Sequence, residues 1–128
     1  GQSLLFVVPK IVSHFSSRAS SLELGNTSVW REYNDVRWLV DTYVQLLRMP
    51  PNTEPINVAS GQLHSLTDVI NTLSDLSQHE LAVTCNPAFV RSNEVGRLGG
   101  DPARLLSLNT KVSPYTLRDT LAWMLSCA

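Results

Sequence analysis

The sequence has no excess of charge of either sign. Ten Lys and Arg residues face eleven Asp and Glu residues, and the formal net charge is -1. A protein that holds a nucleic-acid backbone or an anionic membrane surface needs a basic field, so this composition argues against both partners. The longest uninterrupted apolar run, Leu4 to Val8, ends at Pro9 and is far too short to span a bilayer. We therefore expect a soluble chain.

Cysteine and methionine are scarce as well. Cys85 and Cys127 show no Cys-x-x-Cys spacing and there is no second pair, which suits a reducing compartment, so we expect a cytoplasmic protein. The chain begins at Gly1 and its only methionines are Met49 and Met124, so we expect a fragment or a processed product. Its 128 residues are enough for one domain with its own core.

Apolar residues at helical spacing predict two helices in the first half of the chain. One runs from about Val7 to Arg18, with Pro9 tolerated in its first turn. The second follows Asn34, a plausible N-cap, and is the most clearly marked helix of the chain. Its apolar stripe is predicted to face the core and consists of Val36, Leu39, Val40, Tyr43, Val44 and Leu47.

Capping signals predict three helices in the second half. Ser65 with Asp68, and Thr116 with Asp119, have the spacing of capping boxes ahead of apolar stripes. Asp101 as N-cap, with a proline at the first helical position, indicates a short helix between them.

Alternating residues predict the strands. Leu22-Glu23-Leu24 and Ser28-Val29-Trp30 flank Gly25-Asn26, which is a hairpin signal. Ile56 to Ala59 is expected to form a short strand. Leu81, Val83 and Cys85 alternate as a half-buried strand, which makes Cys85 a small buried hydrophobic residue. The fold class is therefore mixed α/β.

The stretch from Asn86 to Leu105 carries the most chemistry. It places Arg91 three residues before Glu94 and then adds a segment containing Gly96, Gly99 and Gly100. A guanidinium matches a diphosphate, and a neighbouring carboxylate can accept hydrogen bonds from ribose hydroxyls. The pair is thus a candidate nucleotide clamp, although spacing alone favours an ordinary salt-bridged loop.

The Arg91–Glu94 spacing, followed by Gly100-Asp101-Pro102, resembles the C-terminal end of the extended short-chain dehydrogenase family that acts on nucleotide sugars. Within that family the resemblance is to the GDP-mannose dehydratases and GDP-deoxyhexulose reductases. Arg31, just before the second helix, matches the arginine that reaches the nucleotide phosphates in that family. Its alternative is the exposed end of an edge strand. Lys10, in Phe6-Val7-Val8-Pro9-Lys10, matches a position near the nucleotide.

The resemblance implies that residues 1–128 form the small α/β substrate-binding domain of that fold. The segment Ile56 to Ala59 would then be an orphaned strand of a missing N-terminal Rossmann domain, which binds NAD or NADP in the whole enzyme. The implied ligand is a nucleotide-diphosphate sugar, GDP-linked rather than UDP- or dTDP-linked. Its implied binding residues are Arg31, Arg91, Glu94 and Lys10.

Hydride chemistry in this family needs a Gly-rich turn that opens a helix and a Tyr-x-x-x-Lys pair. Neither occurs here, because the residues four positions after Tyr33, Tyr43 and Tyr115 are an Arg, a Leu and an Asp. We therefore expect no catalytic residue, no cofactor site and no metal site within these residues, and an isolated fragment without turnover. The alternative is a stand-alone interaction module that kept the fold and lost the ligand. Uncovered apolar faces and an unpaired strand edge also predict a homo-oligomer.

Overall fold

The computed structural model describes residues 2–51, 54–90 and 92–128. The elements, in chain order, are α1 (Val7–Ser16), β1 (Ser21–Leu24), β2 (Trp30–Arg31), α2 (Val36–Leu47), β3 (His64–Ser65), α3 (Leu66–Ser77), β4 (Ala82–Cys85), the 3-10 turn η1 (Pro87–Phe89), β5 (Arg97–Leu98), α4 (Ala103–Ser107) and α5 (Leu117–Ser126). Helices and short strands are interleaved, which confirms the mixed α/β class.

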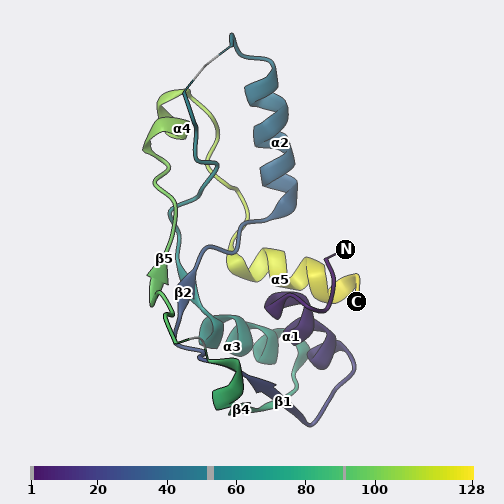
Figure 1. The fold of residues 1–128 in the computed structure, drawn as a ribbon. Coiled ribbons are helices and arrows are strands. Elements are labelled where there is room, and N and C mark those ends of the chain that lie inside the picture. Colours follow the sequence, from purple (N-terminus) through teal and green to yellow (C-terminus); the bar gives the residue numbers. More distant parts are fainter. Residues whose placement is uncertain (1, 52–53, 91) are drawn as a thin grey trace.

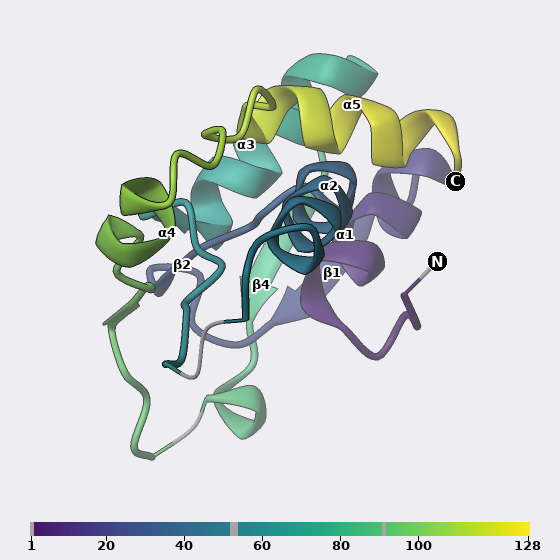
Figure 2. The ribbon, with the colours of Figure 1, turned by 90° about the horizontal axis from the view of Figure 1, so that it is seen from above.

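The core lies at one end of an elongated molecule, where α1, α3 and α5 pack against one another (Figure 1). Viewed from above, α5 runs across α3 and α1, and β1 and β4 lie behind the helices (Figure 2). The fully buried side chains there include Ile11, Phe15, Val69, Leu73 and Leu121. Their burial follows from the helical periodicity of the sequence, because each sits on the stripe that faces the other helices.

Two small sheets complete the fold, and neither contains the predicted hairpin. Strand β1 pairs in parallel with β4, with Leu22 opposite Val83, while β2 pairs with β3 and β5. The hairpin prediction was wrong. The two leucines of β1 are buried against the helices, and the strand that pairs with β1 is β4, which follows α3 in the chain and lies in the same layer. Residues around Trp30 instead build the second sheet, in which β3 is antiparallel and β5 parallel to β2.

The capping boxes are confirmed. Ser65 Oγ accepts from the Asp68 N–H at 3.0 Å, and Asp68 Oδ2 accepts from the Ser65 N–H at 2.8 Å. Thr116 and Asp119 make the same reciprocal pair at the start of α5. In α4 the helix begins one residue later than predicted, although Asp101 Oδ1 still accepts from the Ala103 N–H at 2.9 Å.

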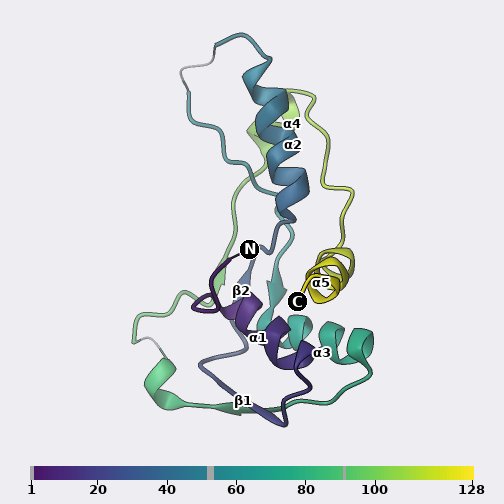
Figure 3. The same ribbon diagram turned by 90° about the vertical axis from the view of Figure 1, so that its right-hand side faces the viewer.

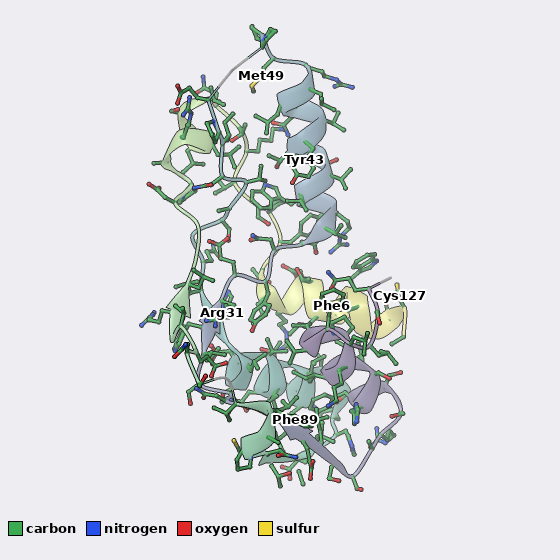
Figure 4. All side chains as sticks on the ribbon, in the orientation of Figure 1. Phe6, Arg31, Tyr43, Met49, Phe89 and Cys127 are labelled. Atoms are coloured by element: carbon green, nitrogen blue, oxygen red, sulfur yellow. The ribbon has the colours of Figure 1, made fainter. Side chains whose placement is uncertain are left out.

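Helix α2 covers the residues of the predicted apolar stripe, from Val36 to Leu47, but that stripe does not face the core as predicted. Its N-cap is Asp35 rather than Asn34, and its buried residues are Trp38 and Thr42. The predicted core stripe is largely exposed, with Tyr43 at 50% and Leu47 at 84%. The helix stands apart from the α1–α3–α5 layer and points away from it (Figure 3). We call the end of the molecule that contains α2 and α4 the distal half. Tyr43 and Met49 lie in it (Figure 4).

Three further expectations meet different outcomes. The structure assigns no strand to Ile56–Ala59, whose backbone runs as an irregular segment. Cys85 is exposed rather than buried, because the outer face of β4 is open to solvent. Across the described residues, no helix combines the length and the apolar character needed to cross a bilayer.

Candidate functional site

An open hollow lies where the β3–β2–β5 sheet meets the distal half of the molecule. Its volume is about 580 Å³. It is lined by the end of β2, by an irregular segment before β3, and by the link between β5 and α4: Arg31, Glu32, Asn57, Val58, Ala59, Leu98, Gly99 and Gly100. Three stretches that are far apart in sequence therefore meet at one surface depression.

Glu32 joins these three stretches. Its Oε2 accepts from the Ser60 N–H at 2.9 Å and from the Asn34 side-chain amide at 2.9 Å. Its Oε1 accepts from the Gly100 N–H at 2.7 Å and from the Gly61 N–H at 3.2 Å. Burial alone would raise the pKa of this carboxyl, but the Asn34 amide and the three backbone N–H donors outweigh it and hold the pKa below its ordinary value. Glu32 is therefore a carboxylate kept in its ionised form.

Glycine is required where the chain passes over this carboxylate. A Cβ on Gly100 would lie 2.5 Å from the Cβ of Ala59, and one on Gly99 would lie 2.8 Å from Leu63 Cδ2. Gly61 adopts a φ of 74°, in the left-handed region that glycine favours. Gly99 and Gly100 are thus part of a close-packed crossing, whereas a Cβ on Gly96 would meet nothing within 4 Å.

Arg31, on β2, lies at the rim of the hollow and is half-buried (Figure 4). Its Nη1 donates to the Trp30 carbonyl oxygen at 2.8 Å. Among the residues that the structure describes, no carboxylate lies within ion-pair distance of this guanidinium. Burial raises the pKa of the nearby Tyr33, and the positive charge of Arg31 opposes that rise. Arg31 thus brings to the hollow a guanidinium that makes no ion pair with any described residue, although the ionised Glu32 carboxylate lines the same hollow.

Lys10, on α1, belongs to a separate cluster and does not line the hollow that holds Arg31. Its Nζ donates to the Glu23 carbonyl oxygen at 3.1 Å and lies 5.6 Å from the ring centroid of Phe89. The Glu23 side chain accepts from Asn86 Nδ2 at 3.0 Å. The structure thereby brings Lys10 beside the segment that leads into Arg91. Arg91 itself falls outside the described residues.

Glu94 follows in the loop before β5 and is half-buried. Its Oε2 is buried and has no hydrogen-bond partner among the described residues. A buried carboxylate oxygen without a donor is uncommon in folded proteins, because desolvation is then uncompensated. This observation is compatible with a hydroxyl donor from a ligand, and the assigned role of Glu94 stays a prediction.

A larger hollow, of about 810 Å³, lies between α1, α5 and the start of α2. Its lining is mainly apolar and comprises Gln2, Leu4, Pro9, Val12, Ser13, Ser16, Ser17, Asn34, Val36, Thr120, Trp123, Met124, Cys127 and Ala128. It holds no charged side chain. Its neighbourhood, from Leu4 to Val7, is also exposed and apolar.

In the sequence, Glu32 is visible only as the acid that follows Arg31. Its role at the centre of the hollow comes from backbone donors in two remote segments, which no local pattern reveals. The pairs Ser60-Gly61 and Gly99-Gly100 were the available signal, because glycine marks places where the backbone approaches another group closely.

This fold matches a portion of solved extended short-chain dehydrogenase/reductase structures. The chain is homologous to part of the nucleotide-sugar epimerases, dehydratases and reductases of that family. It is 32% identical over 108 residues to the GDP-6-deoxy-D-talose 4-dehydrogenase of Aggregatibacter actinomycetemcomitans, which covers 84% of this chain and 37% of the relative. No family model matches the sequence.

Two solved structures agree with this relationship. A candidate epimerase from Burkholderia cenocepacia J2315 matches 99% of this chain and 42% of its own, with a TM-score of 0.94 and 35% identity. The RMD of Pseudomonas aeruginosa, solved in complex with NADPH, matches 98% of this chain and 43% of its own, with a TM-score of 0.89 and 28% identity. The chain thus spans about two fifths of the length of these proteins.

Proposed function

We propose that this chain is the substrate-binding portion of an NAD(P)-dependent nucleotide-sugar dehydratase, epimerase or reductase, and that it binds the nucleotide diphosphate. The observation that carries the proposal is Arg31, a cation without a carboxylate partner among the described residues, at the rim of a hollow with preformed backbone walls. A guanidinium in that setting is suited to a phosphate or diphosphate.

A GDP sugar is the favoured ligand. The Aggregatibacter relative is a GDP-6-deoxy-D-talose 4-dehydrogenase, and a relative from Pseudomonas aeruginosa, also 32% identical, is a GDP-6-deoxy-D-mannose reductase. Lys10, Arg91 and Glu94 complete the proposed set. Lys10 lies beside the segment that leads into Arg91, and Glu94 has a buried carboxylate oxygen with no hydrogen-bond donor among the described residues.

The dinucleotide-binding portion, in this proposal, lies outside these 128 residues. Two observations support it. The Tyr-x-x-x-Lys pair of the family is absent from the sequence, and each relative is more than twice as long as the matched segment. The bound NADPH in the Pseudomonas structure supports NAD or NADP as the cofactor of the complete protein.

The apolar stripe of α2 supports a large partner surface. Val36, Val40, Tyr43, Val44 and Leu47 recur on one helical face and are each at least 39% exposed. An apolar face of this length on a soluble domain is typical of an interface. The same stripe favours the second candidate function, an interaction module without a ligand, so nucleotide binding separates the two.

Titration calorimetry and thermal unfolding with GDP, UDP and dTDP test the proposal. A ligand at ten times its Kd stabilises the folded state by about 1.4 kcal/mol. Arg31→Ala should weaken GDP binding by about 1.5 to 3 kcal/mol, the size of a charge-assisted hydrogen bond, with little loss of stability. Arg91→Ala should have a similar effect.

Arg118→Ala is the matched control, because Arg118 is exposed and makes only a surface ion pair with Asp75 at 4.0 Å. It should bind GDP as the wild type does. Equal GDP affinity in the wild type and in Arg31→Ala would refute the assignment of Arg31. No binding of any nucleoside diphosphate by the wild type would favour the interaction module.

A further inference from the structure

Among the described residues, Glu32 accepts hydrogen bonds from two remote backbone segments and has no cationic partner. Asp35 pairs with Arg37, whereas every donor to Glu32 is neutral. These donors are three backbone N–H groups, the Asn34 amide and the Ser60 hydroxyl, the last at 3.3 Å. A carboxylate bound in this way fixes backbone position more strictly than a flexible ion pair does.

The two carboxylate oxygens of Glu32 accept hydrogen bonds from different backbone groups. Oε2 holds Ser60, and Oε1 bridges the Gly61 and Gly100 N–H groups. Ser60 and Gly61 belong to the segment before β3, and Gly100 belongs to the link before α4. Oε1 therefore connects two walls of the hollow. Because Oε1 accepts from both Gly61 and Gly100, these walls cannot separate without breaking a hydrogen bond to Glu32.

We propose that Glu32 is the positioning residue of the Arg31 hollow, whose carboxylate fastens both backbone walls in place before a nucleotide diphosphate enters. This inference rests on the proposed function for the identity of the ligand. Glu32 itself does not bind the ligand. It acts through the walls and through the strand that carries Arg31.

A negative charge beside a diphosphate site has two opposing effects. It repels the anion, and it organises the backbone that receives the anion. Neutral donors disperse the carboxylate charge on this side of the hollow, so organisation is the larger effect. The sign of the change in affinity on removing the charge therefore decides between the two.

Glu32→Gln is the decisive variant. Glutamine keeps the shape of the side chain but turns an NH2 donor toward one of the backbone N–H groups, so one oxygen's bonds are lost. Calorimetry with GDP should show an affinity about tenfold or more below that of the wild type. Glu32→Asp keeps the charge but is one methylene shorter, so its GDP affinity should lie between those of the wild type and Glu32→Gln. It also tests the inference if Glu32→Gln does not fold. Asp75→Asn removes an exposed carboxylate from α3 and should leave GDP binding unchanged.

NMR supplies a readout that does not depend on any ligand. In the wild type, the amide proton shifts of Ser60, Gly61 and Gly100 should titrate together, with one midpoint below that of an ordinary glutamate. In Glu32→Gln this shared titration should vanish and the three amides should exchange faster with solvent. GDP affinity in the wild type should decline with the same midpoint, which a merely structural side chain would not cause.

GDP binding by Glu32→Gln that equals or exceeds that of the wild type would overturn the inference, and so would three amides that titrate independently. If the wild type binds no nucleoside diphosphate, the proposed function fails, while the amide titration and exchange still decide whether Glu32 fastens the walls.

Discussion

Asp35 connects α2 to the rest of the fold, and its removal should cost measurable stability. The Asp35 side chain is fully buried. Its Oδ1 accepts from the N–H of Arg37 at 2.9 Å, which caps the helix, and from Arg37 Nε at 2.9 Å. Its Oδ2 accepts from Arg37 Nη2 at 2.6 Å and from the Thr120 hydroxyl of α5 at 2.9 Å. The Arg37 guanidinium in turn lies 4.1 Å from the ring centroid of Tyr115.

The size of the loss follows from these contacts. Removing an N-cap costs about 1 kcal/mol. Breaking a fully buried ion pair costs about 3 to 5 kcal/mol, but the Arg37 side chain is 34% exposed, so about 1 to 2 kcal/mol is the appropriate share. Thr120 keeps a second acceptor, the Thr116 carbonyl oxygen at 3.1 Å, and adds little. Asp35→Ala should therefore lower the free energy of unfolding by about 2 to 3 kcal/mol.

Asp35→Asn separates the two contributions. The asparagine can still cap α2 and loses the charge, so the loss should be about half that of Asp35→Ala. Urea unfolding followed by circular dichroism measures both values. In thermal unfolding, Asp35→Ala should lower the Tm by about 10 °C for a domain of this length.

The effect should depend on pH. The hydrogen bonds from Arg37 lower the pKa of Asp35, and they outweigh burial, which raises it. A lowered pKa in the folded state contributes stability that is present above the ordinary aspartate value, about 3.9, and is lost as the pH falls through the folded value. The stability difference between wild type and Asp35→Asn should thus narrow below about pH 4. A loss under 0.5 kcal/mol in Asp35→Ala, roughly the level of neutral surface changes, or a pH-independent difference, would refute this account.

Two further outcomes are expected. Gly100→Ala should destabilise the fold by about 1 to 3 kcal/mol through overpacking against Ala59, whereas Gly96→Ala, where a Cβ meets nothing within 4 Å, should be neutral in the same unfolding assay. The apolar face of α2 should make the 14.2 kDa chain sediment as a larger particle at micromolar concentration, and Val40→Lys should shift it toward monomer. Asn71→Lys on the exposed side of α3 is the control for that shift, and a wild-type monomer at high concentration would contradict it.

Local signals in the sequence determined the helices. The reciprocal Ser65–Asp68 and Thr116–Asp119 caps, the start of α1 at Val7 and the inward stripe of α3 follow from interactions within four residues, so a linear pattern carries them. The resemblance that rested on Arg31 and on Gly100-Asp101-Pro102 likewise led to the family, because motif residues are read one by one from the chain.

Tertiary structure alone decided which surfaces meet. Strand β1 pairs with β4 and not with β2, the next strand in sequence, because the leucines of β1 are buried in the layer to which β4 belongs. The periodicity of β1 does not indicate which strand will pair with it. The stripe of α2 has the spacing of a core face, yet Trp38 and Thr42 are the buried residues, since burial depends on where the helix lies and not on its pattern. Glu32 shows the same limit at the candidate site: its identity is visible beside Arg31, but its donors come from residues 28 and 68 positions away, and only folding brings them to one carboxylate.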